Sequence, residues 1–312
     1  MKYPLPKRRT YTRKTQKEKT KKTQKHKKEK FKKLNCSQKP KQKKGNYTCY
    51  SNNTLQYLKK LWNLRHPDVK INETSDRDIW NKLKEKMQNS CDEESCWLRQ
   101  NFVKNKVTNE MINYTFMPPA PNTWKSDINT WLNSTDISNV MKHYEKNYNN
   151  FAFIGPSPID FDIVKLNKLC VWNELCNFNL QNIINKNKNK IGIIFNLDYH
   201  TGKGTHWVAL FIDIKKKYIF FFDSIGNEIP HQIHKLVEKI IYQGKHLREP
   251  INFHFDKNSP FEHQQGQTEC GMYCLYFIIS LLTNKKNPNY FKTTIISDKE
   301  MESCRHEYFN II

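Results

Sequence analysis

The spacing of apolar residues divides the chain into a helical first half and a second half with strands. Between residues 51 and 150, apolar positions recur every three or four residues, which predicts amphipathic helices. The residues that set this period are Leu55, Leu58, Leu61, Trp62, Leu64, Ile79, Trp80, Leu83 and Met87. A Pro-rich break over 117–121 follows, and Ser134 with Thr135 can then cap a helix that runs through Tyr144.

After the Gly-Pro-Ser-Pro stretch at 155–158 the pattern changes to short, continuous apolar runs. Three of them predict buried strands, over 191–197, 207–214 and 218–222. We then expect a helix over 230–243, a short strand over 251–255, a buried helix over 271–282 and a final helix near 297–309. These elements predict an α+β fold, in which helices flank a central sheet.

Charge separates a tail from the rest of the chain. The net charge is +23, but residues 1–44 hold 20 Lys and Arg against two Glu, and the remainder holds 33 basic and 28 acidic residues. The tail has too few apolar side chains to offset the chain entropy of folding. The predicted organisation is therefore a disordered basic tail (1–45), a helical region (46–150) and a catalytic core (151–312).

The tail has two interpretations. Its lysines are suited to bind nucleic acid, an anionic core surface or a nuclear-import receptor. Alternatively, they only keep the protein soluble. The net charge of the rest is close to that of an ordinary globular protein, which excludes a uniformly basic nucleic-acid-binding protein.

Other classes are excluded by what the sequence lacks. It has no apolar run of about 18 residues and no apolar signal segment at its start, so we expect neither a membrane span nor secretion. Nine cysteines without a signal predict reduced thiols. Cys91 and Cys96, and Cys170 and Cys176, lack the spacing of zinc ligands, so no metal or cofactor is expected.

Three polar residues stand at the ends of apolar elements and are the candidates for chemistry. His206 opens one predicted strand, Asp223 follows the next, and Cys270 precedes the buried helix. If the two strands form a hairpin that turns at residues 215–216, paired positions sum to 431, and Asp223 becomes a diagonal neighbour of His206 on the same face. Each residue alone also has an ordinary structural role, as a buried thiol, an edge histidine or a turn former.

Together these residue types fit nucleophilic catalysis. The dipole and free amides at a helix N-terminus favour a thiolate, a neighbouring imidazole can hold and return a proton, and a carboxylate can orient that imidazole. Gly271 allows a substrate to approach the backbone amide of Cys270, which is one oxyanion donor. A second donor can come from a side-chain amide of Gln264, Gln265 or Gln267.

The order and surroundings of these residues resemble the Ulp1/adenain-type cysteine proteases. The motifs that carry the resemblance are Thr205-His206-Trp207-Val208-Ala209, Phe222-Asp223-Ser224 and Gln264-Gln265-Gly266-Gln267-Thr268-Glu269-Cys270-Gly271. Further stretches look like the polyprotein-processing proteases of large cytoplasmic DNA viruses, including asfarvirus and giant-virus types: Asn196-Leu197-Asp198, Thr201-Gly202-Lys203-Gly204 and Cys91-Asp92-Glu93-Glu94-Ser95-Cys96. The resemblance is strong over about 190–282 and absent from the tail.

The resemblance implies a papain-related fold with a mixed sheet and a role for each matching residue. Cys270 would be the nucleophile, His206 the base and acid, and Asp223 the residue that orients His206. Gln264 stands where the family places its oxyanion glutamine, with Gln267 as the alternative. Trp207 resembles the aromatic residue over the catalytic centre, although an ordinary core tryptophan is the other interpretation. Residue 223 is Asp, where the asfarvirus enzyme has Asn.

The resemblance also implies cleavage after Gly-Gly in viral structural polyproteins during virion maturation. The expected location is the virion core and the host cytoplasm or viral factory. Three alternatives stay open: an isopeptidase that removes a ubiquitin-like modifier from host proteins, an acyltransferase with the same order of residues, and a nucleic-acid-binding core protein whose protease-like domain is inert.

Overall fold

A mixed sheet of five strands forms the centre of the fold. The computed structural model describes residues 31–40, 46–165 and 168–311. The strands are β1 (Phe151–Pro158), β2 (Lys190–Asn196), β3 (Trp207–Asp213), β4 (Tyr218–Phe222) and β5 (His254–Lys257), adjacent in that order. The two outer pairs are parallel and the two inner pairs antiparallel. This arrangement confirms the predicted α+β class.

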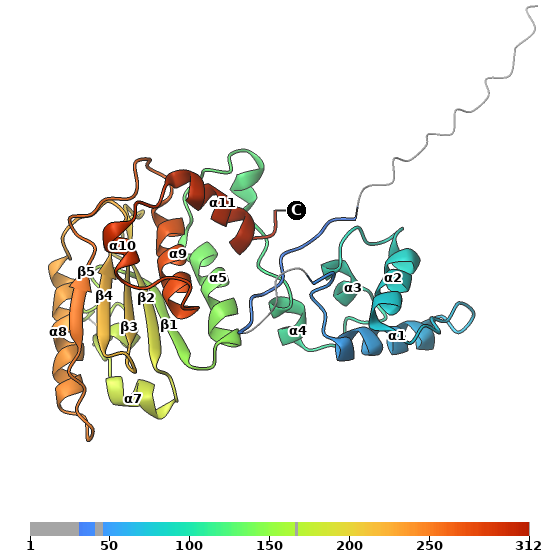
Figure 1. Ribbon diagram of the computed structural model, residues 1–312, viewed down its shortest axis with the longest axis horizontal. Helices are drawn as coiled ribbons and strands as arrows, with labels where there is room; N and C mark the ends of the chain where they lie inside the picture. Colours follow the sequence, from blue (N-terminus) through green and yellow to red (C-terminus); the bar gives the residue numbers. More distant parts are fainter. Residues whose placement is uncertain (1–30, 41–45, 166–167, 312) are drawn as a thin grey trace, which may run out of the picture. The chain divides into compact units, whose positions relative to one another are not determined.

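Helices precede the sheet and cover both of its faces (Figure 1). The longer ones are α1 (Asn52–Arg65), α2 (Asp76–Met87), α5 (Ser134–Asn147), α8 (His231–Lys245), α9 (Cys270–Leu282) and α11 (Asp298–Tyr308). The shorter ones are α3 (Ser95–Arg99), α4 (Asn109–Tyr114), η1 (Asn122–Lys125), α6 (Asn173–Cys176), α7 (Leu180–Asn185) and α10 (Tyr290–Thr293). No helix in the described part of the chain has the length and apolar character needed to cross a lipid bilayer.

Side chains of β3 alternate between two hydrophobic cores, because successive residues of a strand point to opposite faces. Val208 and Leu210 pack in the core that includes α8, whereas Ala209 and Phe211 pack in the core of α9 and α5. Both faces are therefore buried, which explains why this strand is a continuous apolar run.

The predicted hairpin has the predicted register. Ala209 pairs with Phe222 and Asp213 with Tyr218 in antiparallel β3 and β4. This pairing places the residue after β4, Asp223, close to the residue before β3, His206.

One strand was not anticipated. β1 contains Gly155, Pro156 and Pro158, which we interpreted as a break between the two halves of the chain. Proline removes a hydrogen-bond donor, but β1 is an edge strand with only one partner and tolerates the loss. Helix α5 also begins differently, since Asn133 rather than Ser134 or Thr135 caps it.

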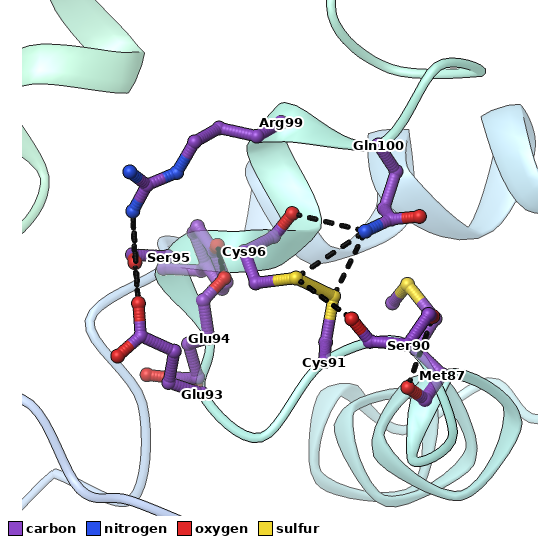
Figure 2. Close-up of a disulfide and its surroundings, with 10 residues drawn as sticks. Met87, Ser90, Cys91, Glu93, Glu94, Ser95, Cys96, Arg99 and Gln100 are labelled. Carbon is purple, nitrogen blue, oxygen red and sulfur yellow. Dashed lines mark hydrogen bonds and ion pairs between the residues drawn. A yellow bond between two sulfur atoms is a disulfide. The ribbon is translucent and has the colours of Figure 1, made fainter.

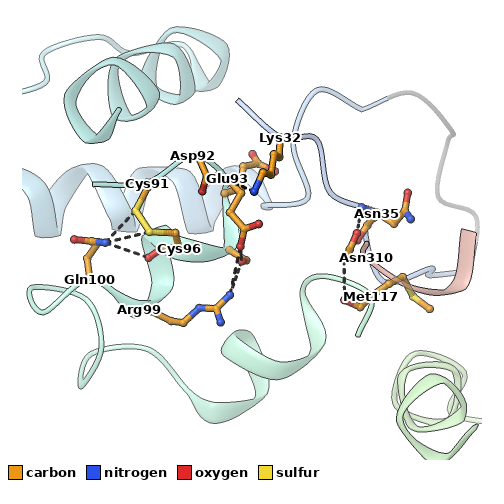
Figure 3. A network of polar contacts seen from close by, with 12 residues as sticks. Lys32, Asn35, Cys91, Asp92, Glu93, Cys96, Arg99, Gln100, Met117 and Asn310 are labelled. Atoms are coloured by element: carbon orange, nitrogen blue, oxygen red, sulfur yellow. Dashed lines mark hydrogen bonds and ion pairs between the residues drawn. A yellow bond between two sulfur atoms is a disulfide. The ribbon is translucent and has the colours of Figure 1, made fainter. Parts of the chain in front are cut away.

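The prediction of a disordered tail as far as residue 45 is wrong for residues 31–40. Leu34 is buried in the core of the helical region, and the Asn35 backbone amide donates to Asn310 at 2.6 Å. Lys32 pairs with Asp92 at 3.0 Å (Figure 3). The few apolar side chains here find cover on distant parts of the chain, which composition alone does not reveal. The rest of the tail, 1–30 and 41–45, lies outside the described residues.

The prediction of reduced thiols is also wrong for six of the nine cysteines. Disulfides join Cys36 to Cys49, Cys91 to Cys96 and Cys170 to Cys176, with Cα–Cα distances of 5.1, 5.6 and 6.2 Å. These distances fall in the range that a disulfide needs, and the cysteine count could not reveal them. Figure 2 shows the amide of Gln100 donating to both sulfurs of the second bond, at 3.0 and 3.3 Å. Cys270, Cys274 and Cys304 are free and buried.

A buried histidine anchors the segment 31–40 to α5. The Ser37 hydroxyl lies 2.9 Å from His143 Nδ1, and the Asn147 side-chain amide donates to the same hydroxyl at 2.8 Å. The Ser37 hydroxyl thus bridges the histidine and the asparagine of α5. Burial lowers the pKa of His143 to about 4.

Protonation of His143 should destabilise the fold as pH falls. Its pKa is about 4 in the folded state and 6.5 when exposed, so stability present above pH 6.5 is lost progressively towards pH 4. We expect this group to cost about 2–3 kcal/mol of unfolding free energy between pH 7 and pH 4. Urea unfolding of wild type and His143→Gln across this range measures the difference. His231→Gln, which alters an exposed histidine, is the control. Parallel pH curves for wild type and His143→Gln would contradict this account.

Candidate active site

Helix α9 presents Cys270 from a rigid position. All 13 residues of the helix are buried, so its apolar surface packs on every side. At its far end, the Lys190 ammonium donates to the carbonyls of Leu281 and Leu282 at 3.3 and 2.9 Å. Cys270 is the first residue of the helix, where the backbone N–H has no partner within the helix and remains available as a donor.

The structure brings the three candidate residues together. His206 Nε2 lies 2.7 Å from Asp223 Oδ1, and the Cys270 side chain is near enough to the His206 ring to help raise its pKa. Because Nε2 faces the carboxylate, Nδ1 is the ring nitrogen left for the thiol. The Asp223 side chain is 1% exposed and the His206 side chain 15%. The predicted proximity of Asp223 to His206 is thus confirmed.

Two opposing influences set the protonation of His206. Burial by itself lowers the pKa of His206, but the hydrogen bonds and charges of Asp223 and Cys270 outweigh burial and raise the pKa to about 9. The imidazole is therefore protonated at neutral pH. An imidazolium beside a thiol favours the thiolate, which is the nucleophilic form of cysteine.

Residues 223–224 connect the histidine to the glutamine loop. The Ser224 hydroxyl donates to Gln264 Oε1 at 2.7 Å, and the backbone amide of Gln264 donates to the Ser224 carbonyl at 2.9 Å. Gln264 Nε2 donates one hydrogen to the Gly266 carbonyl at 2.8 Å and keeps a second hydrogen. The buried Gln264 is thus held in one orientation, as an oxyanion donor requires. Gln267, the alternative, is exposed.

Asn258 is a residue of this site that sequence reasoning missed. It is buried, and its side chain both accepts from the Asp223 backbone amide at 2.9 Å and donates to the Asp223 carbonyl at 2.7 Å. These two bonds fix the backbone that carries the carboxylate. Asn258 lies in a polar loop, where nothing in the local sequence marks an asparagine as different from its neighbours.

Trp207 borders both Gly271 and a cavity. Its indole nitrogen donates to the Leu132 carbonyl at 3.0 Å, and a Cβ added to Gly271 would lie 3.1 Å from Leu132 and 3.4 Å from Trp207. Trp207 and Leu132 also line a cavity of about 560 Å³. Trp131 lines the same cavity and is 44% exposed. It is a second residue of this site that sequence reasoning missed, because the exposure of a tryptophan cannot be read from the sequence.

Residues 127–312 match the Ulp1 protease family, C-terminal catalytic domain. The chain belongs to the Ulp1 protease family. It is 30% identical over 286 residues to a putative thiol protease of Acanthamoeba polyphaga mimivirus, a match that covers 85% of this chain and 90% of that protein. It is 26% identical over 263 residues to a SUMO-1 cysteine protease of African swine fever virus, which covers 80% and 93% of the two chains. This family member is accordingly a cysteine protease, and the enzyme class predicted from the sequence is confirmed.

The fold agrees with the family. The crystal structure of a protease from African swine fever virus has a TM-score of 0.59 with this protease, at 20% identity, and the match covers 89% of this chain and 97% of that one. The family match begins at residue 127, before α5, and α5 packs on β1 and α9. Helix α5 therefore packs with the sheet, although the predicted boundary at 150 separates them.

In the part of the chain that the structure describes, no three His, Cys, Asp or Glu side chains are grouped to hold a metal ion. The four cysteines examined above as zinc ligands, Cys91, Cys96, Cys170 and Cys176, are paired in disulfides.

Asp223→Ala should move the alkaline limb of the pH profile of kcat/KM, the pH range over which activity falls as the pH rises. In wild type, activity should fall as His206 loses its proton with a pKa of about 9. Without the carboxylate, burial dominates and lowers that pKa, so the limb should shift to lower pH by roughly one to two units. Asp223→Asn keeps an uncharged acceptor and should shift it less. The measurement is kcat/KM on a peptide between about pH 5 and 10, with Asp256→Ala, which breaks an exposed ion pair, as control. An unmoved limb in Asp223→Ala would refute the assignment.

Proposed function

We propose that this protease cleaves viral structural polyproteins after Gly-Gly pairs, with Cys270 as nucleophile. The observation that carries the proposal is the contact of Trp207 and Leu132 with Gly271, next to the thiol. A Cβ on Gly271 itself would already be crowded there. A substrate that passes these side chains to reach Cys270 is best accommodated when its residues have no side chains.

The proposed chemistry assigns a role to each of four residues. The Cys270 thiolate attacks the carbonyl carbon before the scissile bond, and the oxyanion accepts from the Cys270 amide and the second hydrogen of Gln264 Nε2. The His206 imidazolium gives its proton to the leaving amine as the C–N bond breaks. Neutral His206 then takes a proton from water, whose oxygen attacks the thioester carbonyl. The C–S bond breaks, which releases the acid and leaves Cys270 as a thiolate beside a protonated His206. Asp223 remains a carboxylate and stabilises the imidazolium.

The relatives support a viral setting. Two relatives that match this chain over at least 90% of their own lengths come from a mimivirus and from African swine fever virus. We therefore propose that the protease acts during virion maturation, in the virion core and the viral factory in the host cytoplasm. Residues 1–30, with 14 Lys and Arg against two Glu, would hold it to nucleic acid or another anionic core surface.

A second candidate is an isopeptidase that removes a ubiquitin-like modifier. The name of the African swine fever virus relative, SUMO-1 cysteine protease, favours it for that protein. The two functions differ in what the enzyme must contact, because a folded modifier needs a broad docking surface and a polyprotein only an extended groove.

Cys270→Ala should reduce cleavage of Gly-Gly-x peptides by at least about a thousandfold, since no other group can form the thioester. Wild type and variant are compared on a peptide panel by mass spectrometry, with Cys274→Ala as the control that alters a buried thiol outside the proposed chemistry. Undiminished cleavage by Cys270→Ala would eliminate the mechanism.

In the substrate, Gly→Ala at either residue before the scissile bond should abolish cleavage. If such a peptide is still cleaved, the narrow passage beside Trp207 is excluded. If a SUMO fusion is cleaved far faster than a free peptide of the same sequence, the isopeptidase is favoured.

Deletion of residues 1–30 should abolish salt-sensitive binding to DNA or RNA and spare cleavage of short peptides. The truncation keeps Phe31–Ile312, the unit that contains the site. Binding is followed by fluorescence anisotropy between about 50 and 300 mM salt, and the full chain should show a steep salt dependence. Equal affinity of both forms at every salt concentration would show that the tail does not bind nucleic acid.

A further inference from the structure

A buried ion pair lies immediately before the nucleophile. Glu269 is the residue N-terminal to Cys270, and its carboxylate accepts from Arg305 of α11 through two bonds: Nε to Oε2 at 3.0 Å and Nη2 to Oε1 at 2.8 Å. The side chains are 4% and 0% exposed. A carboxylate and a guanidinium removed from water are costly unless they are paired and fully hydrogen-bonded. Glu269 lies in one of the motifs that carry the family resemblance, but the mechanism above gives neither residue a role.

Arg305 connects two segments that border the site, 268–269 and the residues around Thr130. Besides Glu269, it donates to the Thr130 carbonyl at 3.0 Å and to the Thr268 carbonyl at 3.5 Å. Thr130 leads directly into Trp131 and Leu132, which line the cavity beside Trp207. The Arg305 side chain thus holds both the residues just before Cys270 and the segment 130–132, which a substrate would pass.

We propose that Glu269 and Arg305 are positioning residues that fix the backbone at Cys270 and keep the net charge beside its thiolate at zero. The inference rests on the proposed role of Cys270 as nucleophile. A lone carboxylate one residue from a thiolate would disfavour that thiolate, and a lone guanidinium would favour it. Because the paired charges cancel, the stability of the Cys270 thiolate is set by the N-terminus of α9 and by the His206 imidazolium.

The other ionisable groups around the pair do not supply this compensation. His206 and Asp223 face Cys270 from the ends of β3 and β4, and Cys274 lies beside it within α9. On the side of Glu269, Tyr273 and Asp298 are hydrogen-bonded to each other at 2.9 Å. Among these groups only Arg305 forms an ion pair with Glu269.

The test measures the thiolate directly, by the rate at which iodoacetamide alkylates Cys270 as a function of pH. The Cys270 peptide is quantified by mass spectrometry, so turnover is not needed. Arg305→Met leaves Glu269 uncompensated and should raise the pH midpoint of alkylation by roughly one unit, whereas Glu269→Gln leaves Arg305 uncompensated and should lower it. The double variant Glu269→Gln/Arg305→Met should return to within about 0.3 unit of wild type. Lys292→Met, which breaks an exposed pair, should not move it.

Opposite shifts that cancel in the double variant establish the charge balance. Shifts in the same direction, or none in folded variants, overturn it. If Arg305→Met does not fold, Glu269→Gln and the double variant still test the charge balance, because the alkylation midpoint should shift in the first and stay in the second.

Arg305→Lys separates geometry from charge, since it keeps the cation and loses the two-bond contact. It should lower kcat several-fold with KM and the alkylation midpoint near wild type, and an unchanged kcat would refute the positioning role. Failure of the proposed function would appear elsewhere, as peptide cleavage by Cys270→Ala.

Discussion

The packing of the buried helix α9 on one face of the sheet is the constraint on which the rest of the site depends. Phe277 of the helix stacks on Phe222 of β4, with ring centroids 4.8 Å apart and planes 9° from parallel. Aromatic contacts of this kind bury large areas and have a preferred geometry, so the helix cannot slide along the sheet without losing them. Cys270 begins that helix, and Asp223 follows directly after Phe222. The contact that holds the core together therefore also sets the distance between thiol and carboxylate.

Short polar bridges then transfer this geometry to the surrounding loops. Asn258 holds the backbone of Asp223, Ser224 holds Gln264, and Arg305 holds the residues on either side of the approach to Cys270. These side chains are buried, so water competes little for their hydrogen bonds, which are strong and directional as a result. The candidate catalytic groups lie at the ends of helices and strands. They are nevertheless held rigidly, because these hydrogen bonds restrict the connecting loops.

Oxidised and reduced cysteines coexist because they occupy different parts of the fold. The three disulfides close short stretches of chain around the helical region and the loops before β2, with sequence separations of 5 to 13 residues between partners. The three free thiols lie in α9 and α11 and are buried. Burial raises the pKa of Cys274 and of Cys304, which keeps these two as unreactive thiols. Cys270 differs from them in its imidazolium partner rather than in its exposure.

Period and order along the sequence determined the buried strands, the buried helix that follows Cys270, and the β3–β4 register, which brings Asp223 close to His206. These are local properties, because a two-residue or 3.6-residue repeat and a short hairpin depend on neighbours in the chain. The meeting of Cys270 with these two residues depends instead on the packing of α9 on the sheet. Other features depend on contacts between residues that are distant in sequence, or on exposure to solvent. These are edge strand β1, the packing of residues 31–40, the disulfides, the roles of Asn258 and Trp131, and the Glu269–Arg305 pair. Their residue types are ordinary at their positions, and only the tertiary structure decides which of them meet.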